Sequence, residues 1–228
     1  MKTTGGTTEQ KRRAGESAAA LVEDGTTVGL GTGSTAAHAI RAIGEAVAGG
    51  LDVVGVPTSF DSRELAREAG IPLRSPDEVE RLDLAIDGAD QVADGDLVKG
   101  GGAAHAREKI VDAVAERFVV VADPSKEADA LDHAVPLEVL PDTRSTAAAA
   151  VREAGGDPVL RKAERKDGPV ITDNGNLVLD CDFGRIDDPG ALAGTLSAVP
   201  GVVEHGLFVD MADEVHVGTA DGVTVRQF

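Results

Sequence analysis

The stretch TTVGLGTGSTAAHAIRAIGEAVAGG, residues 26–50, decides how this chain is expected to fold. Its apolar beginning at 26–31 predicts a strand, and the Ala-rich run from Ser34 or Thr35 to a closing Gly-Gly pair predicts a helix. The glycines between them follow the spacing G-x-G-x-G, which is not the dinucleotide-binding fingerprint. The stretch is therefore a strand, a glycine turn and a helix N-terminus, the arrangement at which an open α/β sheet binds its ligand.

The alternation of strand and helix continues on both sides of this stretch. Further strands are predicted at 52–57, 82–87, 97–102 and 119–123, and further helices at 9–22, 58–69 and 104–118. Strands that alternate with helices indicate a parallel sheet.

Beyond Lys126 the order of elements changes. Strands are predicted at 136–141, 158–163, 170–183 and 202–208, with an Asn-Gly hairpin turn at 174–175, and helices at 143–156 and 188–201. This order is ferredoxin-like. We therefore expect an α/β fold: a Rossmann-like parallel-sheet domain (1–127 plus 207–228) with a smaller α+β domain (128–206) inserted late in the chain. The strand-like tail is expected to return to the first domain.

Composition excludes several classes of function. The net charge is −18, and the aromatic residues are five Phe with no Trp or Tyr. Such a chain repels nucleic acids and anionic membranes and lacks side chains on which bases stack. The acidic residues are spread along the chain, as in the solvated coat that halophiles use. An anionic substrate would therefore need local cations.

Cys181 is the single cysteine, which indicates a reducing compartment and a small core residue. The sequence shows no transmembrane stretch and no apolar signal segment at its start. We expect a cytoplasmic protein.

The glycine turn carries groups that could hold a monophosphate. Thr32, Ser34 and Thr35 bring hydroxyls to the start of the predicted helix, where free amides also point at an anion. The alternative is a plain tight turn with a Ser or Thr N-cap. The turn alone leaves both interpretations open.

Charged side chains follow the third and fourth strands. Asp87 and Asp90 can face one cleft and handle protons or hydroxyls, although an acidic turn would have the same sequence. Lys99 precedes three glycines, where the backbone can approach a ligand. Glu108 lies three residues before Val111, on or beside the apolar helix face, where burial would make it a better base. Alternatively, it is an acidic residue that the helix dipole stabilises near the N-terminus, or it pairs with the neighbouring Arg107 or Lys109.

The histidines show no spacing typical of a metal site, and His105 is expected on a solvated helix face.

The motifs GLGTGSTAAH, VPTSF, DGAD, KGGGAAHAREK, ADPSK, PLEV, ITDNGN and PGVVEHGLF, in this order, closely resemble ribose-5-phosphate isomerase of the A type. The resemblance spans nearly the whole chain. It implies interconversion of ribose 5-phosphate and ribulose 5-phosphate without metal or cofactor, and a homodimer or homotetramer.

The resemblance also implies roles for individual residues. Glu108 would be the general base of a cis-enediolate mechanism, Lys99 and Asp87 would stabilise the developing charge, and Asp87 with Asp90 would hold hydroxyls and assist ring opening. The substrate-binding set would be Thr32, Gly33, Ser34, Thr35, Asp87, Gly88, Ala89, Asp90, Lys99, Gly100, Gly101, Gly102, Lys126 and Lys11.

Two positions depart from the family pattern. Gln91 stands where Glu is frequent, and His105 stands where an apolar residue is common. Two alternatives remain: an amino-sugar-phosphate isomerase/deaminase, which would need His105 near the base, and a non-catalytic sugar-phosphate sensor, which would be expected to lack Lys99 or Glu108.

Overall fold

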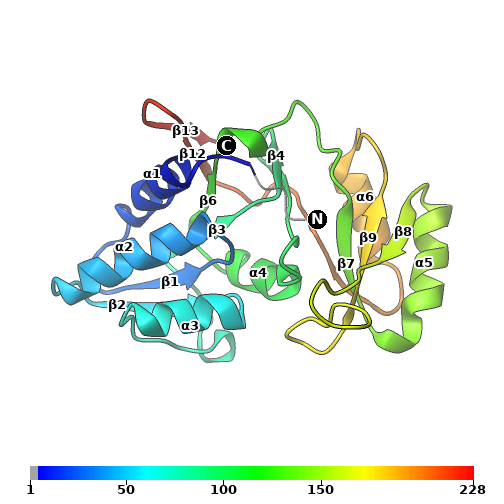
Figure 1. Cartoon of the computed structure of the whole chain (residues 1–228), viewed down its shortest axis with the longest axis horizontal. Coiled ribbons are helices and arrows are strands. Elements are labelled where there is room, and N and C mark those ends of the chain that lie inside the picture. The colour runs from blue at the N-terminus through cyan, green and yellow to red at the C-terminus, as the bar shows by residue number, and fades with distance from the viewer. Residues whose placement is uncertain (1–4) are drawn as a thin grey trace. The chain divides into compact units, whose positions relative to one another are not determined.

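The computed structural model describes residues 5–228, which form two compact units (Figure 1). The parallel-sheet unit comprises residues 5–89, 107–127 and 211–228. The antiparallel unit comprises residues 90–106 and 128–210.

The parallel-sheet unit is built on a six-stranded sheet in the order β13-β12-β6-β3-β1-β2. Its strands are β1 (Thr26–Leu30), β2 (Val53–Pro57), β3 (Leu84–Gly88), β6 (Phe118–Ala122), β12 (Glu214–Gly218) and β13 (Val223–Gln227). All neighbours are parallel except β13, which runs antiparallel to β12 at the edge. The tail thus returns to the first sheet as predicted. Because β2 and β3 lie on opposite sides of β1, the strand order reverses between β1 and β3.

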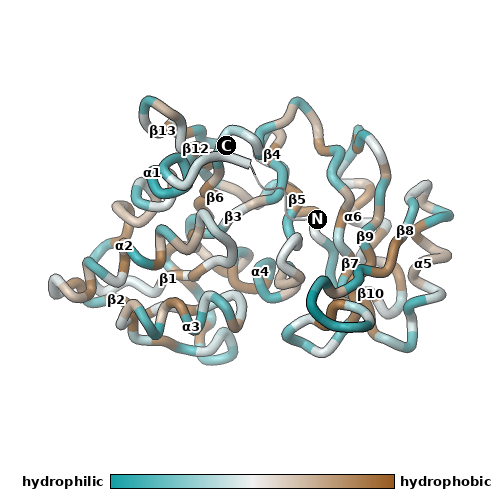
Figure 2. The backbone as a smooth tube through the Cα atoms, viewed as in Figure 1, coloured by the Kyte–Doolittle hydropathy of each residue, from teal (hydrophilic) through white to brown (hydrophobic). Residues whose placement is uncertain are grey.

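Helices cover both faces of this sheet. α1 (Thr8–Ala19), α2 (Ala36–Ala48) and α3 (Phe60–Glu68) share one apolar core with the strands. α4 (His105–Asp112) contributes Val111 to a second cluster with Val56 and Leu82 on the other face. Apolar residues follow the buried strands, as the brown tube of β6 shows (Figure 2).

The antiparallel unit contains the predicted ferredoxin-like order of elements. It runs β7 (Val135–Val139), α5 (Arg144–Glu153), β8 (Asp157–Leu160), β9 (Leu177–Asp182), α6 (Pro189–Ser197) and β10 (Val202–His205), with sheet order β10-β7-β9-β8. Cys181 lies in its core, as predicted, and burial raises the pKa of the thiol to about 12. The expected fold class is confirmed.

The antiparallel unit also contains a three-stranded sheet, which shifts the boundary between the two units from the one we expected. β4 (Gln91–Ala93) pairs with β5 (Asp96–Val98), which pairs with β11 (Leu207–Phe208). This pairing groups residues 90–106 and 207–210 with the antiparallel unit, although our expected boundaries put them in the first domain.

Short 3₁₀ turns complete the fold at η1 (Pro76–Glu78), η2 (Pro124–Lys126) and η3 (Pro141–Thr143). The Asn-Gly turn is present, with a hydrogen bond from the Gly175 amide to the Thr172 carbonyl, but the segment before it forms only isolated bridges. Across the described part of the chain, every helix is too short or too polar to cross a bilayer.

Candidate active site

The glycine turn joins β1 to α2 in the parallel-sheet unit. Gly33 has a φ of 116°, a conformation that residues with a side chain rarely adopt. Thr35 is the N-cap of α2 and is buried, yet its side chain makes no capping hydrogen bond. The first amides of α2 are therefore not satisfied by the Thr35 hydroxyl, which disfavours the interpretation as a plain capped turn.

Thr32 lies at the centre of a group of hydroxyls. Its Oγ1 lies 2.8 Å from Thr58 Oγ1 and donates to Ser59 Oγ at 2.7 Å. Thr58 and Ser59 follow β2, the strand next to β1, and both are buried. Our sequence analysis did not assign these two residues to the site, although they belong to the VPTSF motif that carried the resemblance.

Asp87 is fully buried near the end of β3, across the strand reversal from the glycine turn. Its Oδ1 accepts hydrogen bonds from the Thr32 amide (2.9 Å) and the Gly88 amide (2.7 Å). A Cβ at Gly31 would come within 2.2 Å of that oxygen, so only glycine fits there. The structure therefore brings Thr32, Asp87 and Gly88 together, and Ala89 follows them directly.

Glu108 lies in the first turn of α4 and is 5 % exposed. It lies one turn before Val111, which packs against the sheet with Leu82, so the Glu108 side chain belongs to the same helix face. The predicted burial of this carboxyl group is confirmed.

Lys126 and Lys11, the two lysines expected to bind the phosphate, both belong to the parallel-sheet unit but lie on different elements of it. Lys126 is buried in η2, directly after β6, in a turn that Asp123 caps through the Ser125 amide. Lys11 lies on α1. Its charge contributes to the lowered pKa of His38 on α2, which is caused first by burial and then by Arg41.

Lys99 and the three glycines after it belong to the antiparallel unit. Lys99 follows β5 and is 2 % exposed, with its Nζ 5.3 Å from the centroid of the Phe208 ring. Its amide donates to the carbonyl of Gly206. Phe208 and Gly206 were not predicted as neighbours, because they come from the distant PGVVEHGLF motif.

Asp90 contacts the glycine loop directly. Its Oδ2 accepts a hydrogen bond of 2.6 Å from the Gly101 amide. His105, which we expected on a solvated helix face, is fully buried in the same unit. That expectation is wrong, because the imidazole lies against the glycine loop, where a Cβ at Gly100 would come within 2.7 Å of His105 Nδ1.

Within residues 5–228, His, Cys, Asp and Glu side chains nowhere gather in threes suited to a metal ion.

Comparisons with known proteins place this geometry in context. The family model described as "Ribose 5-phosphate isomerase A (phosphoriboisomerase A)" matches residues 54–222. The ribose-5-phosphate isomerase A of Haloarcula marismortui is 73% identical over 222 residues, 97% of each chain. That of Halorubrum lacusprofundi is 66% identical over the full length of both.

Solved structures named as ribose-5-phosphate isomerases are also similar to this chain over nearly its whole length. The ribose 5-phosphate isomerase A of Methanocaldococcus jannaschii superposes with a TM-score of 0.92 at 44% identity, covering 96% of this chain and 98% of that one. A D-ribose-5-phosphate isomerase in complex with phospho-erythronic acid gives a TM-score of 0.95 at 42% identity, covering 98% and 100%.

Proposed function

Since this chain belongs to the ribose 5-phosphate isomerase A family and interconverts D-ribose 5-phosphate and D-ribulose 5-phosphate, we propose how its own residues carry out that reaction. The observation that carries the proposal is the position of the glycine turn and Asp87 on either side of the strand reversal between β1 and β3. In sheets of this kind, ligands bind at that point.

The turn at 32–35 binds the phosphate. The N-terminal amides of α2 and the hydroxyls of Thr32, Ser34 and Thr35 supply donors, and the hydrogen bonds from Thr32 to the hydroxyls after β2 hold the turn in place. Lys126 and Lys11 supply positive charge, which a chain of net charge −18 needs locally to bind an anion. A related D-ribose-5-phosphate isomerase was solved in complex with phospho-erythronic acid, a phosphorylated sugar acid. That complex supports a site for a phosphorylated sugar in this chain.

Glu108 acts as the general base. It takes the proton from C2 of the opened aldose and returns it to C1, through a cis-enediolate, so that one carboxyl group serves both steps. Between the two steps the hydroxyl proton of O2 passes to O1, so that C2 becomes the carbonyl carbon of the ketose. It is buried, and a positioned base contributes roughly 10²–10⁴-fold to such a step.

Lys99, Asp87 and the glycine-loop amides act on the substrate oxygens. The Lys99 ammonium and the amides of Gly100 and Gly102 stabilise the negative charge of the enediolate, while the Gly101 amide is held by Asp90. Each such donor contributes about 10²–10³-fold. Asp87 and Asp90 hold hydroxyls and assist ring opening. The Gly101 amide donates to Asp90 Oδ2, and we assign Asp90 Oδ1 to a substrate hydroxyl. None of these steps uses a metal or a cofactor.

We infer that the chain works in the cytoplasm as a homodimer or homotetramer. Exposed apolar side chains on described elements, among them Phe60 and Ile110, support contacts between copies. The mass in solution, measured by light scattering, tests this assembly, and a monomer under all conditions would contradict it.

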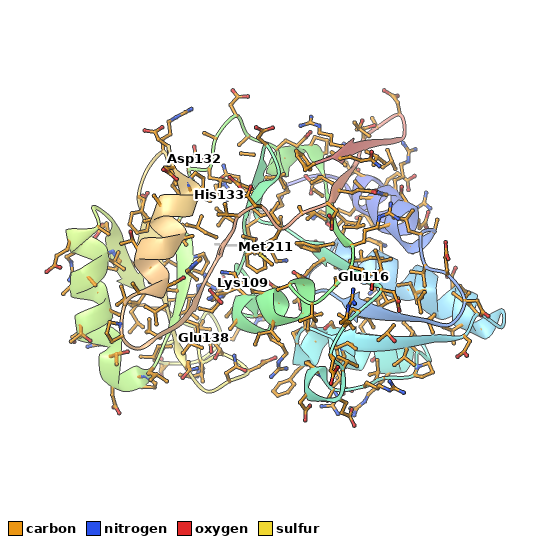
Figure 3. The ribbon with its side chains drawn as sticks, turned by 180° about the vertical axis from the view of Figure 1, so that it is seen from behind. Lys109, Glu116, Asp132, His133, Glu138 and Met211 are labelled. Atoms are coloured by element: carbon orange, nitrogen blue, oxygen red, sulfur yellow. The ribbon has the colours of Figure 1, made fainter. Side chains whose placement is uncertain are left out.

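The direct test of the mechanism is Glu108→Gln. Turnover of ribose 5-phosphate is measured with a chelator present, and substrate binding is measured by calorimetry. The variant is expected to bind substrate and to lose roughly 10²–10⁴-fold in kcat. Glu116→Gln is the matched control, because Glu116 is an exposed partner of Arg81 (Figure 3).

Two outcomes would contradict the proposal. Full turnover by a folded Glu108→Gln variant would exclude Glu108 as the base. Binding of the sugar phosphate without turnover by the unmodified chain would favour the sensor.

A further inference from the structure

Arg161, directly after β8, links the glycine loop to the four-stranded sheet of the antiparallel unit. Its Nε donates to Asp180 Oδ2 at 2.9 Å, and its Nη2 also donates to the Asp180 carboxylate. Its Nη1 donates to the carbonyl oxygen of Gly100 at 2.8 Å and reaches that of Gly101 at 3.3 Å. The Arg161 side chain is 12% exposed, so this guanidinium is held almost wholly by protein.

These bonds fix the direction of two peptide groups. In a planar trans peptide, the C=O and the N–H point in opposite directions. Because both carbonyls point at Arg161, the amides of Gly101 and Gly102 point away from it. The first of these amides donates to Asp90 Oδ2 at 2.6 Å. The second therefore points toward the side of the loop on which the Asp90 carboxylate lies.

A contribution to stability alone does not explain the buried ion pair of Arg161 with Asp180. Removing two charges from water costs about as much as their mutual attraction returns, so an ion pair this buried is weak evidence of a stabilising role. A guanidinium, however, presents a rigid fork of donors that can hold one carboxylate and two carbonyls at once. That property suits a residue that fixes a loop.

We propose that Arg161, held by Asp180, is a positioning residue for the isomerisation: it orients the glycine loop so that the Gly102 amide and Lys99 face the substrate oxygens. The inference rests on the proposed role of Lys99 and the loop amides in stabilising the enediolate. Neither Arg161 nor Asp180 touches the substrate in this scheme.

The test is the kinetics of Arg161→Gln. A loop displaced by about 1 Å is expected to lower kcat by about 10²-fold. KM is expected to change less than about threefold, because the phosphate is bound at the turn 32–35 and not by this loop. Arg185→Gln is the matched control, since Arg185 pairs with Asp187 in the same unit but both side chains are exposed. It is expected to leave kcat and KM unchanged.

Asp180→Asn tests whether the two residues act together. It should lower kcat by a smaller factor, and the double variant should be no slower than Arg161→Gln alone, because both changes release the same loop. Circular dichroism and thermal unfolding establish that each variant is folded. If Arg161→Gln does not fold, Arg161→Lys, which keeps the charge but not the fork, is judged by the same separation of kcat from KM.

Unchanged kcat in a folded Arg161 variant would overturn the inference, and so would a rise in KM alone or fully additive losses in the double variant. Lys99→Met distinguishes this failure from that of the mechanism. If Lys99→Met is inactive while the Arg161 variant is fully active, only the positioning role fails. If Lys99→Met is fully active, both proposals fail.

Discussion

Gln91 shows how one side chain can tie two segments of the antiparallel unit together. Its Oε1 accepts hydrogen bonds from the amides of Asp132 (2.8 Å) and His133 (2.9 Å), and its Nε2 donates to Asp132 Oδ1 at 2.6 Å. The amide of Gln91 offers both the acceptor and the donor that this arrangement uses. A glutamate, frequent at this position in the family pattern, could not donate to Asp132 when ionised.

Gln91→Glu is therefore expected to destabilise this chain by about 1 kcal/mol at pH 7, because it places a carboxylate at a buried position against the exposed carboxylate of Asp132. The loss should shrink as the pH falls toward about 4, because one carboxyl group of the pair then takes up a proton and donates. Urea unfolding at both pH values measures this.

The control is Gln227→Glu, because Gln227 is exposed and its amide donates to Glu214 only at 3.5 Å. A smaller loss is expected there. Equal losses in the two variants, or a loss at position 91 that does not depend on pH, would show that the amide is not what ties the segments together.

How much of the site the sequence predicts depends on the kind of contact. The burial of Glu108 could be predicted, because helix periodicity sets which residues share a face with Val111. Thr58, Ser59 and Phe208 could not be assigned to their neighbours, because those contacts depend on the order of strands in the sheets. The sequence of the turn at 31–35 left a phosphate site and a plain capped turn equally open, and only the contact of Thr32 with Asp87 shows which strand lies opposite the turn.

Among the helices and strands, prediction from the sequence fails where the local helix or strand propensity disagrees with long-range strand pairing. A helix is predicted at 104–118, yet α4 ends at Asp112. Ala115 instead forms a parallel bridge with Leu82, and the Leu82 amide donates to the Val114 carbonyl. These pairings outweigh the helix propensity of an alanine-rich segment. β4, three residues long and beginning with a glutamine, shows too little alternation to be predicted.

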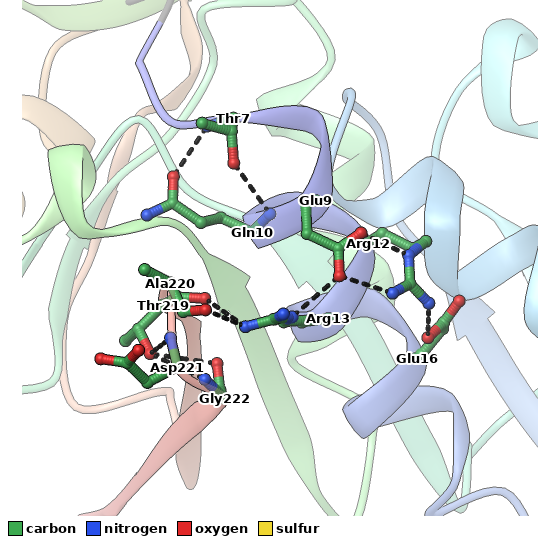
Figure 4. A network of polar contacts seen from close by, with 10 residues as sticks. All are labelled: Thr7, Glu9, Gln10, Arg12, Arg13, Glu16, Thr219, Ala220, Asp221 and Gly222. Atoms are coloured by element: carbon green, nitrogen blue, oxygen red, sulfur yellow. Dashed lines mark hydrogen bonds and ion pairs between the residues drawn. The ribbon is translucent and has the colours of Figure 1, made fainter.

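α1 contacts the turn between β12 and β13, an attachment that no local sequence signal predicts because about 200 residues separate the two (Figure 4). Arg13 Nη1 donates to the Thr219 carbonyl at 3.1 Å and also to that of Ala220. Arg12, one residue earlier, pairs only with Glu9 and Glu16 of its own helix. The two arginines therefore allow a matched comparison.

Arg13→Ala is expected to cost about 1 kcal/mol of unfolding free energy, because two backbone carbonyls lose a charged donor. Arg12→Ala should cost less, since an exposed ion pair within one helix contributes little. Thermal unfolding and hydrogen exchange in β13 measure the difference. A larger effect from Arg12→Ala would contradict this account of how α1 is attached.

The pH dependence of this attachment has a defined sign. Hydrogen bonds from Arg12 and then Arg13 lower the pKa of Glu9 to about 2. A carboxyl group with a lowered pKa stabilises the fold above its ordinary pKa of 4.5 and loses that contribution as the pH falls toward about 2. The contribution of Glu9 to the cost of either arginine substitution should therefore be smaller at pH 3 than at pH 7.

At the scale of the molecule, hydrophobic periodicity predicts the six-stranded and the four-stranded sheets, because each of them packs against its own apolar core. It does not predict where the chain crosses from one unit to the other. The segment 90–106 follows a strand of the parallel sheet in sequence, but its partner is β11, more than a hundred residues later. Pairing at that separation leaves no trace in the local pattern, so the boundary between domains is the least predictable feature of the fold.

The net charge of −18 leads to a prediction about assembly. Two copies of so acidic a chain repel one another at low ionic strength, where the Debye length is about 10 Å at 0.1 M salt, and repel little at 1 M, where it is about 3 Å. Association should therefore strengthen with KCl, giving a larger mass by light scattering at about 2 M than at about 0.1 M. Association that weakens with salt would show that charge pairs, and not apolar contacts, join the subunits.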